Sequence, residues 1–346
     1  MSASNSRVTN PMTYHHLMSR IAHKVYFLTE EVRSDFIEMI RRAADFCGIR
    51  LLAWCIMTNH FHLLAYLPMR EQLSEDEILR RYGVLKGKSR LKALVDELAA
   101  MRRRENGERD VQERLEAITK QMYDIGELMK IVKQWMTQEY NRRYAHVGTL
   151  WEAVYKDVIV PAEPAKLAER AGYIHLNPIR AAICTEFAEY PWSSFTAFSR
   201  GDDIAVSGLR FIYGEDAPVG EIAEAHRELM AKLLEQIKLE RALEIVRKRQ
   251  AGFDMPLDPL TSEALLSQAA EHIKKVQDES VEFKMIRRMR GRPAVRDALE
   301  KEIAALLAEN PKMSAAAIME ATGRSRSLVY QCLKQVRQSI KSRKEV

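Results

Sequence analysis

Two hydrophobic patterns run through the first 176 residues. β-rich or alternating runs predict four strands, and the short turn Thr58-Asn59 joins the middle two: Tyr14–Ile21, Ile49–Met57, His60–Leu67 and Leu150–Val160. Helical spacing of apolar residues predicts helices over Glu30–Phe46, Met129–Arg143 and Pro164–Leu176. The simplest packing of these elements is an antiparallel sheet covered by helices on one face. We therefore expect an α+β fold of the ferredoxin-like type.

Charged helical segments interrupt and follow this pattern. The stretch from Met69 to Ile125 is rich in charge and predicts a helical insertion, at about residues 69–127. Beyond about residue 205 long charged helices follow, with breaks at 252–259 and 291–293 that indicate linkers. The sequence thus predicts three domains, namely the sheet domain (1–200), a helical linker region (201–283) and a basic helical domain (284–346).

The basic domain has the spacing of a helix-turn-helix. Predicted helices Val295–Ala308, Ser314–Ala321 and Ser325–Gln338 would pack on a small core: Ile303, Leu306, Leu307, Ile318 and Val329. Side chains that could contact duplex DNA lie near the start of the last helix and in the preceding Arg-Gly-Arg-Pro element: Arg324, Arg326, Tyr330, Gln331, Arg290 and Arg292. The arrangement resembles the DNA-binding domain of resolvases and invertases. A basic linker followed by an ordinary helical bundle is the alternative.

Charge and cysteine content narrow the class of protein. The net charge is +6, but residues 284–346 hold 15 Lys and Arg against 6 Asp and Glu, so the excess is confined to the C-terminal end. Such clustering favours a polyanionic partner. The four cysteines form no CxxC pair, which argues against a zinc ribbon or a disulfide framework. Because no apolar run is long enough for a signal or membrane segment, we expect a cytoplasmic, nucleoid-associated protein.

A pair of histidines is the first candidate for chemistry. In MTNHFHLLAYLP, His60 and His62 are two residues apart on a predicted strand, so both imidazoles face one side and can reach one metal ion. Two histidines lining a half-buried sheet would show the same spacing, and the spacing alone does not decide between these interpretations.

The segment ERAGYIHLNPIRA supplies a candidate nucleophile. Tyr173 and Asn177 are four residues apart at the end of a predicted helix and should share one face. A tyrosine can attack a phosphodiester when a metal polarises the phosphoryl oxygen. Tyr173 could equally be a core aromatic residue, and Asn177 could be the N-cap of the turn PIRAAI, a metal ligand, or both.

Four blocks in fixed order carry a family resemblance: MTNHFHLLAYLP, NRRYAHVGTLWEAVYKDVIV, YIHLNPIRAAI and YPWSSFTAF. Together they resemble the REP-associated tyrosine transposases, within the single-tyrosine HUH transposases, over roughly residues 14–198. The resemblance implies a ferredoxin-like HUH nuclease core, a divalent cofactor (Mg²⁺ or Mn²⁺) and a single-stranded hairpin DNA partner. It implies that His60, His62 and Asn177 bind the metal, and that Tyr173 forms a 5′-phosphotyrosine link.

Residues around the expected cleft complete the prediction. Arg142, Arg143, Lys156 and Arg180 could hold phosphates, and Trp151, Tyr155 and Trp192 could stack on unpaired bases, although core or surface roles fit them as well. We expect the remaining histidines of this region to be structural or at the surface: His15, His16, His23 and His175.

The sequence therefore predicts a metal-dependent single-strand DNA endonuclease and strand-transferase, active as a monomer or homodimer. The alternative is a catalytically silent regulator that binds hairpin or duplex DNA. A third possibility is an RNA-binding protein, which would prefer strands carrying a 2′-hydroxyl.

Overall fold

The computed structural model describes residues 11–22, 28–145, 147–257, 259–275, 292–310 and 313–322, with positions 329, 332, 333 and 336 beyond them. Contacts divide the chain into two compact units. The first comprises residues 1–241 and 256–262, and the second comprises 242–255 and 263–346. Among the described residues, no helix combines the length and apolarity needed to cross a membrane.

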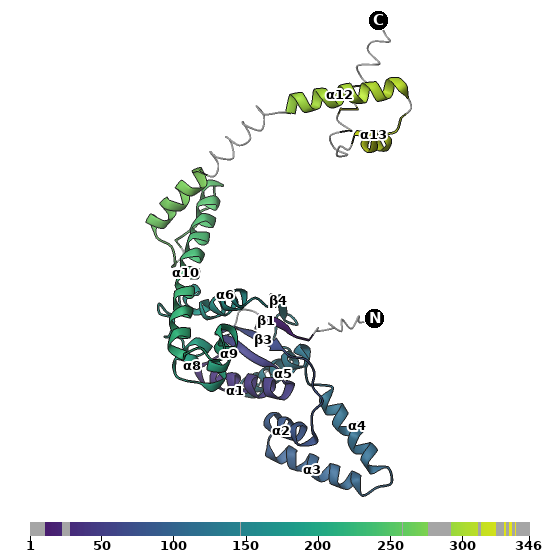
Figure 1. The fold of residues 1–346 in the computed structure, drawn as a ribbon. Coiled ribbons are helices and arrows are strands. Elements are labelled where there is room, and N and C mark those ends of the chain that lie inside the picture. Colours follow the sequence, from purple (N-terminus) through teal and green to yellow (C-terminus); the bar gives the residue numbers. More distant parts are fainter. Residues whose placement is uncertain are drawn as a thin grey trace. The chain divides into compact units, whose positions relative to one another are not determined.

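The first unit is built on a four-stranded antiparallel sheet (Figure 1). Its strands are β1 (Thr13–Arg20), β2 (Arg50–Ile56), β3 (His60–Leu67) and β4 (Lys156–Val160), in the order β2-β3-β1-β4. β3 pairs with both β2 and β1, and β1 pairs with β4, each antiparallel. With one helix connecting β1 to β2 and another preceding β4, this is the ferredoxin-like arrangement. The predicted α+β fold is confirmed.

Two helices cover one face of this sheet: α1 (Glu30–Cys47) and α5 (Ile125–Tyr144). Phe36 of α1 packs edge-on against Phe61 of β3 and stacks on Trp135 of α5, so these three rings tie both helices to the sheet. α1 lies where the sequence predicts a helix; it begins with Thr29 capping the amide of Val32 and ends at Gly48, whose φ of 65° suits glycine.

Helices of the later chain cover the other face. α6 (Pro164–His175) begins at a proline, as predicted, and is followed by the short helices α7 (Asn177–Arg180) and α8 (Ser194–Ser199). α9 (Asp203–Tyr213) approaches β2 so closely that a Cβ on Gly208 would lie 2.6 Å from the carbonyl oxygen of Leu52. The chain beyond residue 200 thus still belongs to the first unit, which then continues into α10 (Val219–Gln250).

The predicted strand Leu150–Val160 is shorter in the structure, where β4 begins at Lys156. Trp151 makes an isolated bridge with Ile21, and its indole nitrogen donates to the carbonyl of Lys133 and to the hydroxyl of Thr137. The Lys133 ammonium donates to the carbonyl oxygens of Ala153 and Val154. Residues 150–152 thus keep isolated backbone bonds to the end of β1, whereas the bonds of Trp151, Ala153 and Val154 to α5 interrupt the strand before Lys156.

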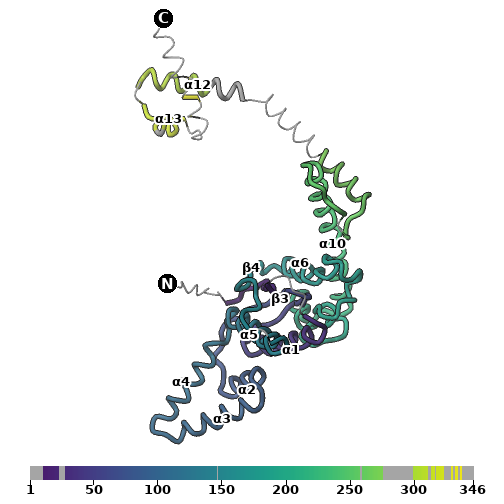
Figure 2. The backbone as a smooth tube through the Cα atoms, turned by 180° about the vertical axis from the view of Figure 1, so that it is seen from behind, coloured from purple at the N-terminus to yellow at the C-terminus, as the bar shows by residue number. Residues whose placement is uncertain are grey.

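Three helices stand between β3 and α5, where the sequence predicts an insertion: α2 (Glu75–Lys86), α3 (Lys88–Arg102) and α4 (Gly107–Thr119). Figures 1 and 2 both show them projecting on the side of α1 and α5, away from α6. Ion pairs to nearby carboxylates hold several of their arginines, including Arg80, Arg81 and Arg114.

The second unit contains α12 (Arg292–Glu309) and α13 (Ala315–Thr322), close to two of the predicted helices. Ile303, Leu307, Ile318 and Val329 lie in one buried cluster, as expected, whereas Leu306 is half-buried and lies outside it. Ser314 accepts from the amide of Ala317 as the predicted N-cap. The helix-turn-helix itself stays a prediction, because its proposed DNA contacts lie outside the described residues: Arg290, the side chain of Arg292, Arg324, Arg326, Tyr330 and Gln331.

Candidate active site on the histidine face of the sheet

His60 and His62 lie on the sheet face opposite α1 and α5. The strand β3 places both rings on this face, 5.1 Å apart between centroids, while Phe61 between them points to the opposite face. His60 is half-buried and His62 is almost fully buried. The predicted common orientation of the two side chains is confirmed.

His16 of β1, which the sequence predicts to be structural or at the surface, is buried beside this pair. Its Nε2 lies 3.0 Å from Nδ1 of His62, and the two rings are stacked at 5.2 Å. The register of β1 against β3 pairs Met18 with His62, so these two side chains share a face of the sheet. His16 lies two residues before Met18 on the same strand and therefore faces the same side. Only this pairing of distant strands places His16 at the site, and no local spacing in the sequence signals it.

Tyr173 reaches the same cluster from α6. Its half-buried ring lies edge-on to His16, with 6.2 Å between the ring centroids. The helix starts at Pro164 and ends at His175, so Tyr173 occupies the last turn before the chain bends into α7. His16 thus contacts both the candidate nucleophile and His62, one of the candidate metal ligands.

Asn177 closes the end of α6. Its amide nitrogen donates to the carbonyl oxygens of Tyr173 and Ile174, both at 3.1 Å. The N-cap interpretation is wrong, because the N-cap of α7 is Leu176 and no side chain caps that helix. The bonds of Asn177 point back to α6 and use only the amide nitrogen, which leaves its oxygen as the atom that would bind a metal.

Cations surround the tyrosine. The guanidinium carbon of Arg180 lies 4.4 Å from the centroid of the Tyr173 ring, and that of Arg170 lies 5.6 Å from it. Arg170 also donates to Nδ1 of His16 at 3.4 Å. Lys156 of β4 shares a row across the sheet with Met18 and His62 and therefore faces the same side. Arg170 lies three residues before Tyr173 on the same helix. Residues at this spacing are neighbours on a helix surface, so the sequence could have predicted that Arg170 lies beside Tyr173.

Other predicted contact residues lie elsewhere. Arg142 and Arg143 belong to α5, on the opposite face of the sheet, and both are paired with Glu139. Two of the candidate stacking residues already make other contacts. Trp151 is buried, and the guanidinium carbon of Arg33 lies 3.4 Å from the ring centroid of Trp192. The structure does not bring these side chains to Tyr173.

Burial and positive charge keep the three imidazoles neutral. Burial, with Arg170 and Lys156 nearby, lowers the pKa of His16 to about 4. Burial and Arg20 lower the pKa of His60 to about 4. Burial first, and then the neighbouring histidines and arginines, hold the pKa of His62 well below its usual range. Neutral imidazoles are the form that binds metal ions.

The hydrogen bonds also test whether a metal fits. Nδ1 of His60 donates to the amide oxygen of Asn59 at 2.7 Å, which leaves the lone pair of its Nε2 for a metal. Because Arg170 only donates, neutral His16 carries its proton on Nε2 and directs it at Nδ1 of His62. If Arg170 withdrew from His16, the proton of His16 could move to its Nδ1. His62 could then carry its own proton on Nδ1 and donate it to Nε2 of His16, which would leave the lone pair of the His62 Nε2 for a metal.

The residues therefore fit a divalent ion through two imidazoles and the Asn177 oxygen, a set that leaves further positions open. Within the described part of the chain, no three His, Cys, Asp or Glu side chains gather in a way that could hold a metal. The proposed set of two imidazoles and one amide oxygen is itself uncharged.

A second buried histidine pair fixes α6 from behind. Nδ1 of His175 lies 2.8 Å from Nε2 of His226 on α10, and Nε2 of His175 lies 2.6 Å from the hydroxyl of Ser194. Tyr213 bonds the other nitrogen of His226 at 2.8 Å, and Ser194 bonds the backbone of Trp54 in β2. The structural role expected of His175 is confirmed.

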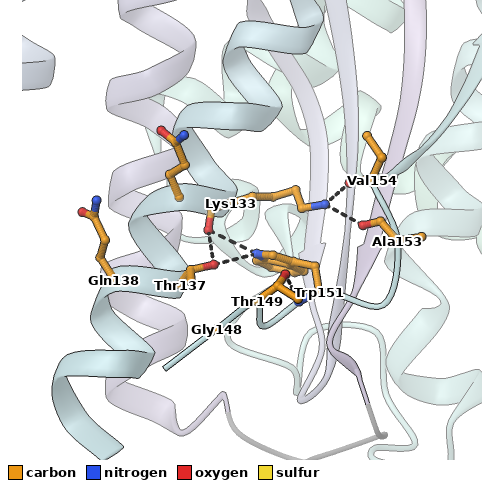
Figure 3. Close-up of a pocket in the computed structure, with 9 residues that line it drawn as sticks. Lys133, Thr137, Gln138, Gly148, Thr149, Trp151, Ala153 and Val154 are labelled. Carbon is orange, nitrogen blue, oxygen red and sulfur yellow. Dashed lines mark hydrogen bonds between the residues drawn. The ribbon is translucent and has the colours of Figure 1, made fainter. Parts of the chain in front are cut away.

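A cavity of about 680 Å³ lies elsewhere, between α5 and the loop that precedes β4. Figure 3 shows Lys133 and Thr137 of α5 facing Trp151, with Lys133 reaching the carbonyls of Ala153 and Val154. Burial lowers the pKa of Lys133 to about 8. Since Trp151 packs on Phe61, this cavity belongs to the face of the sheet opposite the histidines. It is therefore separate from the candidate active site.

Comparison with known proteins bears on the segment that carries the histidines. Residues 9–89 match the model of the family "Transposase IS200 like". The resemblance predicted from the sequence is confirmed there. The matched segment contains β1, α1, β2 and β3, and with them His16, His60 and His62, but it ends before Tyr173.

Similarity to solved structures is more remote. A REP-associated tyrosine transposase bound to a REP hairpin aligns at 12% sequence identity with a TM-score of 0.37, covering 58% of this chain and 87% of that chain. A TM-score of this size does not establish a common fold. No curated protein matches the chain in sequence.

Proposed function

We propose that the protein is a tyrosine-dependent transposase or nuclease that cuts and rejoins single-stranded hairpin DNA. The observation that carries this proposal is the contact of Tyr173 with His16, which in turn bonds His62 on the face that the IS200-like segment supplies. His60, His62 and Asn177 would hold Mg²⁺ or Mn²⁺, which polarises a phosphoryl oxygen when bound. The hairpin partner is inferred from the sequence resemblance.

The family resemblance implies the reaction that Tyr173 would carry out. The phenolic oxygen of Tyr173 forms a bond to phosphorus, and the bond from phosphorus to the 3′-oxygen breaks. The phenolic proton passes to water, and the departing 3′-oxygen takes a proton from water. The 5′ end then remains as an ester on Tyr173. Attack by a 3′-hydroxyl reverses these steps and rejoins a strand.

The anchoring of Tyr173 supports this role. α6 is fixed at its end by the bonds of Asn177 and from behind by the His175–His226 pair. The tyrosine itself stays half-buried, so DNA can reach its hydroxyl while its ring remains ordered. A nucleophile held in this way loses little further freedom on reaching the transition state.

A covalent adduct tests the proposal. The full chain would be incubated with 5′-labelled and 3′-labelled hairpin oligonucleotides and Mn²⁺, and adducts would be separated on denaturing gels. We expect an adduct that retains only the 3′ fragment, loss of the adduct in Tyr173→Phe and with EDTA, and retention in Tyr82→Phe, a matched change in α2.

Equal products from wild type and Tyr173→Phe would refute the mechanism. Hairpin binding without cleavage in any metal would instead favour the silent DNA-binding regulator. A partner preference for the same hairpin made of RNA would favour the third possibility.

A further inference from the structure

Two arginines flank the candidate nucleophile from different elements. Arg170 comes from the same helix as Tyr173, and Arg180 comes from the end of α7, seven residues further along the chain. Both guanidinium groups lie within 6 Å of the phenol ring. A bond from Arg241 of α10 to the carbonyl oxygen of Arg180 fixes the backbone at that end. The tyrosine is thus held between two cations of defined position.

Within the described part of the chain, neither cation pairs with a carboxylate of the kind that neutralises other arginines of the first unit. Glu169, beside Arg170 in sequence, pairs with Lys166, and Asp157 pairs with His15 on the opposite face of the sheet. In addition, Nε of Arg180 is buried and has no hydrogen-bond partner among the described residues. A buried donor without an acceptor is destabilising. Such a donor beside a nucleophile indicates that an acceptor arrives with the ligand.

The chemistry of the missing acceptor is that of a phosphate. A guanidinium presents paired N–H donors that match two oxygens of one phosphate group. Arg180 is the nearer of the two guanidinium groups to the Tyr173 ring, at 4.4 Å from its centroid. Lys156 contributes a third cation to the same face.

We propose that Arg170 and Arg180 form a seat for one phosphate, the group that Tyr173 takes over from the DNA. The proposal rests on the proposed function and adds to it the residues that hold the reacting phosphate. The seat binds the phosphodiester before attack and keeps the same phosphate, now an ester of the phenol, afterwards. Arg170 exchanges its long bond to His16 for an oxygen of this phosphate.

A binding experiment locates the seat without requiring cleavage. In the Tyr173→Phe background, a hairpin oligonucleotide would carry one neutral methylphosphonate at each linkage in turn, and its affinity would be measured by fluorescence anisotropy with EDTA present. We expect one linkage whose neutralisation weakens binding about tenfold. Arg180→Gln and Arg170→Gln should weaken binding to unmodified DNA, and should then abolish the sensitivity at that linkage alone.

Control variants separate charge, geometry and folding. Arg180→Lys keeps the positive charge but lacks the paired N–H donors of a guanidinium. It should therefore recover only part of the affinity that Arg180→Gln loses. Arg109→Gln, an exposed change in α4, should leave the sensitivity at that linkage in place. Unchanged unfolding midpoints would show that the arginine variants are folded. For a variant that does not fold, the lysine replacement at the same position takes its place in the comparison.

The outcomes distinguish the seat from the wider function. The seat would be overturned if the losses of binding free energy from an arginine variant and from the methylphosphonate simply add. This holds even if the wild type forms an adduct. Coupled losses in a protein that never forms an adduct would support the seat and refute catalysis. If the hairpin does not bind, inorganic phosphate becomes the probe. A ³¹P line width that is the same for the wild type and for the protein with both arginines replaced would then overturn the seat.

Discussion

The first unit contains two groups of buried histidines that look alike at first sight. One is the His16–His62 pair with its neighbour His60, and the other is the His175–His226 pair behind α6. In both groups a ring nitrogen bonds another ring, and burial is the main cause that lowers the pKa values. Burial and a lowered pKa therefore do not distinguish a reactive group from a structural one.

The difference lies in the remaining atoms of each group. In the His175–His226 pair, Ser194 and Tyr213 occupy both outer nitrogens, and the hydroxyl of Ser194 can donate onward to the carbonyl of Trp54. Every polar atom of that group has a partner. In the other group, the bond from His60 to Asn59 uses only Nδ1, and Nε of Arg180 is a buried donor without a partner among the described residues. Unused binding capacity beside the candidate nucleophile distinguishes this group from the His175–His226 pair.

The largest expected effect separates the two groups by metal binding. His62→Ala removes a proposed ligand, so Mn²⁺ binding followed by electron paramagnetic resonance should be lost and adduct formation should fall more than a hundredfold, beyond the cost of losing an outer-shell partner. His226→Gln should leave Mn²⁺ affinity unchanged and adduct formation within about threefold. A reversed order of the two variants would contradict the distinction.

The second prediction concerns stability against acid. Burial lowers the pKa of His226 from its ordinary 6.5 to about 4, so the folded protein keeps this ring neutral while the unfolded chain takes up a proton. The contribution of the neutral His226 ring to the free energy of unfolding is complete above about pH 6.5 and is lost as the pH falls toward 4. For His226 alone this contribution amounts to about 3 kcal/mol.

Urea unfolding at pH 7.5 and pH 5 tests this sign. Wild type should lose more stability between the two values than His226→Gln, although the variant is already less stable at pH 7.5. His272→Gln, at an exposed position, should behave like the wild type. Equal pH dependence in His226→Gln and wild type would contradict a neutral buried pair.

The sequence predicted most of the sheet, because local patterns determine it. β3 was predicted with the observed bounds, and the ends of α1 and α6 follow from caps and a proline. The start of β4 was wrong because Trp151 and the loop after it bond to α5, which alternation cannot reveal. Which face each helix covers likewise depends on tertiary packing.

The candidate site was predictable only in its local parts. His60, His62, Tyr173 and Asn177 were found from spacings of two and four residues, and their roles stay proposals. His16 was missed because its contact with His62 crosses 46 residues and depends on strand register. Arg142 and Arg143 lie within the block NRRYAHVGTLWEAVYKDVIV, yet α5 carries them to the other face.

The smallest expected effect couples the metal to DNA. The candidate ligands are uncharged, and Arg20, Lys156, Arg170 and Arg180 surround them, so the field opposes a divalent cation until a phosphate arrives. Phosphate would also draw Arg170 from His16, which lets His62 donate to His16 and frees its own Nε2. Mn²⁺ should therefore bind about tenfold more tightly to Tyr173→Phe when uncleaved hairpin DNA is present, and the DNA should gain the same factor from Mn²⁺. Adding Arg170→Gln removes one cation and frees His16, so the DNA-free affinity for Mn²⁺ should rise and the coupling should shrink. Titrations in which the coupling is unchanged by Arg170→Gln would show that this arginine does not link the two ligands.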